Sequence, residues 1–451
     1  MRDVIVMAFF IPSLPVCFFR PYYGILLWTI VAFANPQHLA YGFASTFPIA
    51  EAVGIPTLAG FVIYHRGWRN LATTPFFLLA ILWGWFAFTS VVGTHTPALA
   101  DHIADTWYRL SFVSKILLMA TVAICVINTF ERLRVFALVI AGCFGFFVAK
   151  GLPFMILTGG QVRLYGPPGS MIADNNDFGL ALNMVVPLFF FLAKTESNRR
   201  LKVVLYGLFA ASIPAIFFTY SRGALVGLVA VCFLMFLQMP MRQKVALTPV
   251  IVLTVAFALV FTPQSWRDRM SSLGGETQQL DPSAMERVNA WKFSWNLAQD
   301  YPLTGGGFET YTPDLFKIYA PNARDVHGPH SVYFGVLGEH GFIGLFLYLL
   351  LVFCAVRTTF SVASRARRFG DERALAYALM FRLSLVGFLT SGLFLGRAYF
   401  DFYFADVGCI IVLKCLCERD WAEGRFLGEK EEIEAQDDDS VGELVLADGE
   451  A

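Results

Sequence analysis

The sequence has few charged residues for its length. Only 15% of the 451 residues are Asp, Glu, Lys or Arg, whereas 57% are hydrophobic and the mean hydropathy is +0.59. The formal net charge is zero, so the excess of positive charge typical of nucleic-acid-binding proteins is missing. The apolar runs also recur without a long polar linker between them. Composition therefore predicts a polytopic membrane protein with one membrane domain.

Residue patterns typical of metal sites are also missing. The eight cysteines lie mostly inside apolar runs and have no CxxC spacing, so they are predicted to be small core residues. His327, His330 and His340 lack the spacing of zinc ligands, and no outward loop carries a DxD-like carboxylate pair for Mg²⁺. The sequence therefore predicts neither a metal nor a cofactor.

The hydrophobic runs predict an all-α polytopic integral membrane protein with about 12 or 13 transmembrane helices, since a helix needs roughly 20 apolar residues to cross a bilayer. The first two runs are short and interrupted by proline. The predicted spans are 4–19, 21–34, 47–64, 74–93, 111–129, 135–158, 179–194, 201–219, 222–239, 245–262, 332–356, 374–395 and 399–417.

Basic residues in alternate short loops predict the orientation, because such loops stay in the cytoplasm during insertion. One set of loops contains Arg66, Arg69, Arg132, Arg134, Lys194, Arg199, Arg200, Lys202, Arg242, Lys244, Arg357, Arg365, Arg367, Arg368 and Arg373. The opposite short loops hold only Arg109, Arg163, Arg222 and Arg397. The C-terminus is therefore predicted to be cytoplasmic, and each of the four outer arginines needs a local reason for its position.

A long extramembrane segment, about 263–330, lies on the predicted outer face. It is rich in Gly, Pro, Trp and Tyr, which favours a lid packed on the membrane body over a separate soluble domain. Within it, the pattern predicts a helix from Pro282 to Leu297, broken at 302–307. The predicted organisation is a membrane domain at 1–417, including this lid, and an acidic, disordered cytoplasmic tail at 418–451.

Three outward residues suit diphosphate chemistry. Arg222 opens a membrane helix and Arg287 lies on the predicted lid helix; a planar guanidinium suits phosphate oxygens. His330 ends the lid, and a neutral imidazole could take a proton from a sugar hydroxyl. The alternatives for Arg222 are snorkelling to lipid phosphate or capping its own helix hairpin. For Arg287 they are a surface salt bridge with Glu286 or Asp281 or a stack on Trp291, and for His330 a helix cap or a packed polar residue.

Two further polar clusters have open interpretations. Arg163 precedes a Gly-Pro loop, and Asn176 lies in the run Asp174-Asn175-Asn176-Asp177; these residues either bind sugar or phosphate or form turns and a helix cap. The residues Arg382, Arg397, Asp401 and Asp406 lie in or beside the last two spans. They are predicted to form a structural ion-pair set or the start of an ion pathway.

Four short motifs together resemble the O-antigen ligase and polymerase superfamily of bacterial membrane glycosyltransferases. In chain order they are Ser221-Arg222-Gly223, Arg287 with Trp291 before Pro302-Leu303-Thr304-Gly305, His330-Ser331, and Glu339-x-Gly341-x-x-Gly344. The N-terminal run Asn35-Pro36-Gln37-His38 and the run 174–177 also resemble the O-glycosylation ligases that accompany exosortase systems.

The resemblance implies a metal-independent, inverting transfer of a glycan from undecaprenyl diphosphate to an acceptor hydroxyl on a protein, lipid or polysaccharide. It places the enzyme in the bacterial inner membrane with a periplasmic active site. Arg222 and Arg287 would bind the diphosphate, and His330 would activate the acceptor. The predicted substrate-binding residues beside them are Arg163, Asn176, Tyr220, Ser221 and Glu339. A polysaccharide polymerase of the same superfamily and a membrane transporter or flippase are the alternative functions.

Overall fold

The structure, a computed structural model, describes residues 2–64, 69–99, 102–159, 161–239, 241–242, 244–245, 248 and 282–424. Over these residues the chain forms α-helices and short 3-10 helices and no strand. The α-helices are α1 (Arg2–Phe19), α2 (Pro21–Ala34), α3 (Ile49–Tyr64), α4 (Thr74–His95), α5 (Ile103–Val126), α6 (Phe130–Leu157), α7 (Asn175–Thr195), α8 (Arg199–Phe217), α9 (Arg222–Gln238), α12 (Pro282–Asp300), α13 (Pro313–Tyr319), α14 (Val332–Phe369), α15 (Glu372–Ser391) and α16 (Asp401–Ala422).

Eight of these helices are long and apolar enough to cross a membrane, namely α1, α4, α5, α6, α7, α8, α14 and α15. Three shorter apolar helices, α2, α3 and α9, accompany them. The prediction of an all-α polytopic membrane protein is therefore confirmed. Each predicted span coincides with a helix except 245–262, which lies outside the described residues, as do 263–281 of the lid and 425–451 of the tail.

Several helix ends differ from the predicted ones. α5 begins at Ile103 rather than 111, because its polar first turns continue the helix beyond the apolar run. α14 is interrupted at Gly341, and the part after it, 342–369, is about 42 Å long at 1.5 Å per residue, so its last turns with Arg367 and Arg368 extend past a hydrocarbon core of about 30 Å. α16 continues to Ala422, so the helix includes the first residues of the predicted tail.

Small residues allow close packing around α7, which is central and mostly buried. A Cβ on Gly179 would lie 2.5 Å from the Cβ of Ala224 in α9, and one on Gly387 of α15 would lie 2.6 Å from the carbonyl oxygen of Asn183. The Asn183 amide donates to the Ala224 carbonyl at 2.7 Å and to Ser391 Oγ at 2.9 Å. Close backbone approach with interhelical hydrogen bonds is typical of membrane helix bundles.

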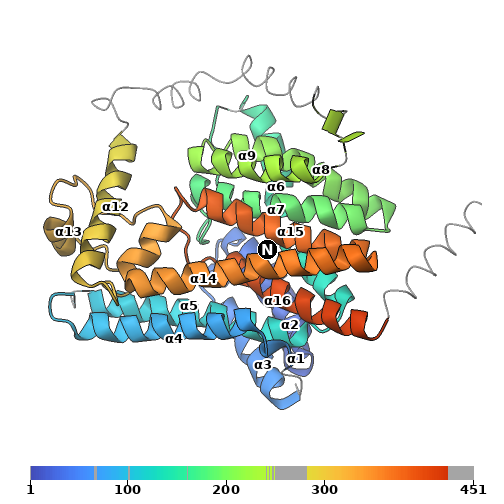
Figure 1. The fold of residues 1–451 in the computed structure, drawn as a ribbon, viewed down its shortest axis with the longest axis horizontal. Coiled ribbons are helices and arrows are strands. Elements are labelled where there is room, and N and C mark those ends of the chain that lie inside the picture. The colour runs from blue at the N-terminus through green and yellow to red at the C-terminus, as the bar shows by residue number, and fades with distance from the viewer. Residues whose placement is uncertain are drawn as a thin grey trace, which may run out of the picture.

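The two ends of the bundle have different chemistry. α12 and α13 lie at one end, where α14 begins, and the C-terminal end of α14 lies at the other (Figure 1). At that second end, Arg134 pairs with Glu196 at 2.5 Å, and Arg365 pairs with Glu418 at 3.3 Å. Two of the basic residues predicted to be cytoplasmic, Arg134 and Arg365, thus lie at the end opposite the lid helices.

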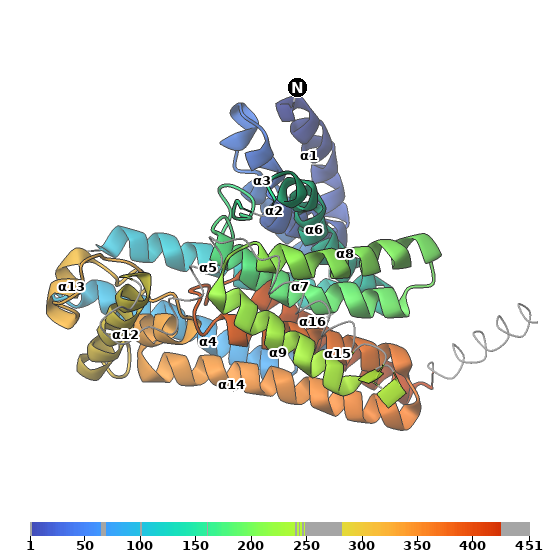
Figure 2. The ribbon, with the colours of Figure 1, turned by 90° about the horizontal axis from the view of Figure 1, so that it is seen from above.

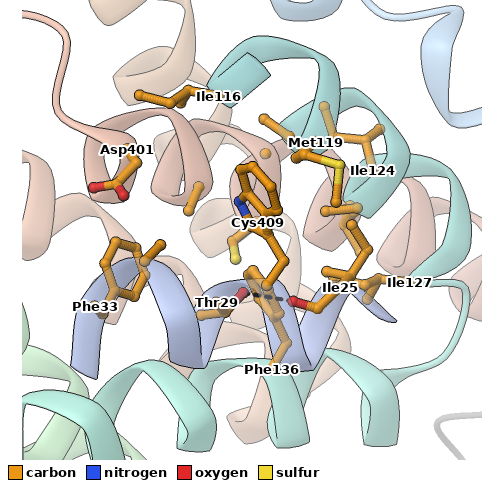
Figure 3. Close-up of a pocket in the computed structure, with 17 residues that line it drawn as sticks. Ile25, Thr29, Phe33, Ile116, Met119, Ile124, Ile127, Phe136, Asp401 and Cys409 are labelled. Carbon is orange, nitrogen blue, oxygen red and sulfur yellow. Dashed lines mark hydrogen bonds between the residues drawn. The ribbon is translucent and has the colours of Figure 1, made fainter. Parts of the chain in front are cut away.

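The first three helices project from the side of the main bundle (Figure 2). α2 attaches them, and Tyr22 Oη donates to the carbonyl of Arg132 at the start of α6 at 3.0 Å. A small, mainly apolar cavity of about 40 Å³ remains between α2, α5, α6 and α16. The Asp401 carboxylate lies at one side of it, among side chains such as Phe33 and Ile116 (Figure 3).

Candidate active site at the lid end of the bundle

The connection between α15 and α16, residues 392–400, joins the parts that carry the predicted site residues. A Cβ on Gly396 would lie 3.2 Å from the Cα of His330. Phe394 lies against Gly223, next to Arg222, where an added Cβ would be 3.0 Å from the Phe394 Cβ. The Phe394 ring also lies 6.4 Å from that of Trp291 on the helix of Arg287. No sequence pattern indicated that this connection contacts all three regions.

A cavity of about 290 Å³ lies between this connection, the lid and the N-terminal parts of α5 and α7. Its lining includes Arg109, Asp177, Glu309, Tyr311, Gly328, Pro329, His330, Ser331, Gly335, Glu339, Gly396, Arg397, Ala398 and Tyr399. Two of the predicted site residues, His330 and Glu339, are among these. The cavity therefore brings residues from five separate parts of the chain to one place.

Two ion pairs form part of the cavity wall. Arg397 Nη2 lies 2.6 Å from Asp177 Oδ2 at the start of α7. Arg109 Nε lies 3.5 Å from Glu309 Oε1. These two ion pairs explain why Arg109 and Arg397 occur on the predicted outer face, where basic residues are rare. Arg397 thus pairs with α7, not with Asp401 or Asp406 as the predicted ion-pair set implied, and Arg382 lies over the Phe360 ring at 4.0 Å.

His330 has a backbone and an environment suited to a neutral base. Its φ of 44° lies in the left-handed region, and the residue is exposed to the cavity. Partial desolvation by the surrounding protein, together with the charge of Arg287, lowers the pKa of His330 to about 4. The imidazole is therefore uncharged near neutral pH, as a general base requires.

The lid helix α12 positions His330 through Trp291. The Trp291 Nε1 donates to the carbonyl oxygen of Pro329 at 2.7 Å, and its ring stacks on Phe334 with centroids 5.1 Å apart. α12 and α13 have a small core of their own, in which Phe293 stacks on Phe316 at 4.5 Å and Leu99 covers one side. The predicted helix from Pro282 is confirmed and extends to Asp300.

The two glycine-containing motifs of the resemblance pack against each other. Inside α14, Gly341 has a φ of 68° and interrupts the helix. The N–H groups of Gly306 and Gly307 donate to the carbonyls of Gly338 and Glu339 at 2.9 and 2.8 Å. A Cβ on Gly341 would lie 2.6 Å from the carbonyl oxygen of Leu303. The glycines are therefore needed for the lid to dock on the interrupted helix.

Glu339 is buried and lines the cavity. Its Oε2 accepts from Tyr399 Oη at 2.5 Å, and its Oε1 accepts from the backbone N–H of Glu309 at 3.1 Å. The next residue, His340, is buried with its Nδ1 2.7 Å from Thr89 Oγ1. Glu339 thus fixes two other groups that line the cavity.

The remaining predicted site residues surround the start of α9 and α7. Arg222 is the first residue of α9 and is half-buried. Ser221 is buried and caps that helix, with Oγ accepting from Ala224 N at 3.2 Å, while Tyr220 is buried with a φ of 58°. Asn176 donates its N–H to the capping Asp174 carboxylate at 2.8 Å. Arg163 is exposed.

Sequence reasoning did not connect Arg109 with Glu309 or Asp177 with Arg397, and it did not single out Tyr399. The available signal was the presence of Arg109 and Arg397 on the face that has few basic residues, because such residues need a partner there. Among the described residues, no group of three or more His, Cys, Asp or Glu is arranged to hold a metal ion.

Two family models match different parts of this chain. Residues 1–197 match a family of unknown function (DUF5935), and residues 207–349 match the family described as O-antigen ligase. No curated protein matches the chain. The O-antigen ligase match includes Arg222, Arg287, His330 and Glu339, and it supports the resemblance of this chain to the O-antigen ligase superfamily.

Proposed function

We propose that this O-antigen ligase-type membrane enzyme transfers a glycan from undecaprenyl diphosphate to an acceptor hydroxyl on the periplasmic face of the inner membrane. The observation that carries the proposal is the placement of His330 in the 290 Å³ cavity, with its pKa lowered to about 4. A neutral histidine open to a cavity is suited to accept a proton from a hydroxyl group.

The proposed reaction is a single displacement. The acceptor oxygen forms a bond to the anomeric carbon while the bond from that carbon to the diphosphate oxygen breaks. The hydroxyl proton passes to His330, and the electron pair leaves with undecaprenyl diphosphate. Inversion at the anomeric carbon follows from one displacement.

Arg222 and Arg287 are proposed to stabilise the departing diphosphate. Fixed guanidinium groups suit this role, because they are charged at every relevant pH and form paired hydrogen bonds with phosphate oxygens. The positive charge of Arg287 lowers the pKa of His330. Arg222 begins α9, beside the connection 392–400 that contacts His330. Arg163, in the loop before α7, and Asn176, at the start of α7, are further proposed substrate contacts. The exosortase-associated subgroup is likewise proposed.

A reconstituted assay tests this function. The full-length protein in lipid vesicles is given an undecaprenyl-diphosphate glycan and candidate acceptors, and released undecaprenyl diphosphate and glycosylated product are measured. His330→Ala, Arg222→Gln and Arg287→Gln should each lower transfer by at least a hundredfold, the scale of a lost general base or charge-stabilising group. His95→Ala and Arg324→Gln, at exposed residues, are matched controls expected to keep wild-type rates.

The outcomes separate the alternatives. A product that grows by repeated units on a lipid-linked acceptor would identify a polymerase. Normal product from Arg222→Gln or His330→Ala would overturn the proposal. Glycolipid translocation without release of undecaprenyl diphosphate, lost on substitution of Arg382 or Asp406, would identify a flippase.

A further inference from the structure

The 290 Å³ cavity has an unusual charge balance for a site in an enzyme proposed to act on a diphosphate. Among the described residues that line it, Arg397 pairs with Asp177 and Arg109 pairs with Glu309, while Glu339 accepts hydrogen bonds from Tyr399 and from a backbone N–H. The two positive charges are thus matched by carboxylates within the wall. Without a surplus of positive charge, this cavity is poorly suited to a diphosphate or another anion.

The same groups suit several hydroxyls at once. An ionised carboxylate has about four lone-pair positions, so Asp177 and Glu309 each keep acceptor capacity beyond the contact with an arginine. Arginine is purely a donor and can bind a hydroxyl oxygen next to each carboxylate. Two donor and acceptor sets of this kind in the wall of one cavity can bind the hydroxyls of a sugar ring.

Aromatic and buried groups make the wall rigid. Arg109 lies over the Tyr399 ring at 5.8 Å, and the Tyr399 hydroxyl is held by Glu339 at 2.5 Å. Tyr311, also in the lining, donates to the carbonyl oxygen of Phe334 at 3.1 Å. The Glu309 backbone N–H is fixed on the same Glu339 carboxylate. A preorganised wall lowers the entropy cost of binding a small polar ligand.

We infer that this cavity is a subsite for one uncharged sugar ring, held through its hydroxyls by the ion pairs Asp177–Arg397 and Glu309–Arg109 beside His330. A volume of about 290 Å³ is at the lower limit of small-ligand pockets, which favours one ring over an extended oligosaccharide. The assignment of this ring to a reacting substrate rests on the proposed function. The ring belongs either to the donor glycan or to the acceptor.

Binding of simple methyl glycosides tests the subsite without turnover. The full-length protein in nanodiscs is studied by saturation-transfer NMR with the methyl glycosides of glucose, galactose, mannose and N-acetylglucosamine, and with methyl glucuronide and methyl galacturonide. At least one uncharged glycoside should bind, and should bind at least about tenfold more tightly than either uronide, a factor that corresponds to roughly 1.4 kcal/mol.

Neutral replacements of the carboxylates should reverse this preference. Asp177→Asn leaves the charge of Arg397 without its carboxylate, and Glu309→Gln does the same for Arg109. Both variants should lose affinity for the uncharged glycoside by about tenfold and gain affinity for a uronide, because hydrogen bonds to charged groups contribute roughly 1.5–3 kcal/mol. A purely structural role of the ion pairs predicts no gain of uronide binding. Asp314→Asn is the matched control, because Asp314 forms an exposed pair with Lys317 at 2.7 Å.

Kinetic measurements then distinguish the two sources of the ring. A rise of about tenfold in the acceptor KM of Asp177→Asn, with the donor KM unchanged, assigns the subsite to the acceptor, and the opposite result assigns it to the donor. The inference is overturned if no uncharged glycoside binds, or if the carboxylate variants and Asp314→Asn bind the panel alike. Glycoside binding in a protein that transfers no glycan would overturn the proposed function and leave the subsite standing.

Discussion

Trp291 on the lid helix donates its indole N–H to the carbonyl oxygen of Pro329 at 2.7 Å, and so holds the residue directly before His330. The φ of 44° at His330 is a conformation that non-glycine residues adopt only when the surroundings impose it. The hydrogen bond from Trp291 is one such constraint, and the close approach of Gly396 is another. The lid therefore acts on the site through the backbone of His330.

Trp291→Phe tests this link, because it keeps an aromatic ring against Phe334 and removes the hydrogen bond. A lost hydrogen bond costs roughly 0.5–1.5 kcal/mol, so we expect kcat to fall by about threefold to tenfold. Steady-state kinetics of glycan transfer measure the effect. Trp295→Phe is the control, because Trp295 is exposed and lies edge-on to Phe342, and it should keep the wild-type kcat. Equal kcat values in all three proteins would show that the hydrogen bond does not position His330.

The low pKa of His330 predicts the pH dependence of transfer. With a pKa of about 4, the imidazole is neutral at every pH well above this value, and it becomes protonated as the pH falls through it. The rate should therefore stay constant from about pH 8 to about pH 5.5 with respect to this group and fall below about pH 5. A pH–rate profile in reconstituted vesicles measures this limb; a fall centred near pH 6.5, the ordinary pKa of histidine, would contradict it.

Arg287 contributes to this low pKa through its positive charge, second to desolvation. Replacing it by Gln removes the repulsion of the protonated imidazole, so the pKa of His330 should rise toward 6.5. Histidine-selective NMR titration of Arg287→Gln measures the shift without any need for activity. Arg324→Gln is the control, and an unchanged His330 titration in both variants would place Arg287 out of electrostatic reach of the imidazole.

Gly341 is predicted to be indispensable for docking of the lid on α14. Its φ of 68° and ψ of −171° belong to a region used almost solely by glycine, and its added Cβ would meet the Leu303 carbonyl at 2.6 Å. Gly341→Ala should lower the free energy of unfolding by about 1–3 kcal/mol or more and lower the melting temperature. Gly84→Ala in α4, where an added Cβ meets nothing within 4 Å, should keep or raise the melting temperature. Equal melting temperatures for the two variants would contradict the prediction.

The orientation of the bundle is testable with a reporter enzyme that is active only outside the cytoplasm. A fusion at Ser197, beside the basic loop between α7 and α8, should be inactive. A fusion at Pro321, in the segment after α13, should be active. The reverse pattern would place the His330 cavity on the cytoplasmic side and overturn the periplasmic assignment.

Much of this molecule follows from local sequence properties. Apolar runs near 20 residues predicted the apolar helices of the membrane body, because a membrane span has to satisfy its own backbone hydrogen bonds. Proline at 282 and the aromatic spacing after it predicted α12. The chemistry of single residues, namely an arginine at a helix start, an arginine on the predicted lid helix and a histidine at the end of the lid, was sufficient to propose Arg222, Arg287 and His330.

Helix ends and side-chain ion pairs were harder to predict from the sequence, because they depend on the residues that surround each group in the folded protein. The extension of α14 to Phe369 follows from polar turns that leave the membrane, where hydropathy carries no signal. The expected pairing of Arg397 within the last two spans was wrong, because Arg397 reaches Asp177 on α7 instead. Residues that approach one another across 220 positions of sequence leave no local pattern.

The sequence by itself determined the class of the protein, its helices and the residue types that suit glycan transfer from a diphosphate, since these depend on composition and short-range order. Only the tertiary structure decided that the connection 392–400 joins the three predicted residues, that two ion pairs balance the charge of the cavity, and that His330 is held neutral. Those properties depend on distances between distant segments and on the exclusion of water by packed helices, which arise only when the chain has folded.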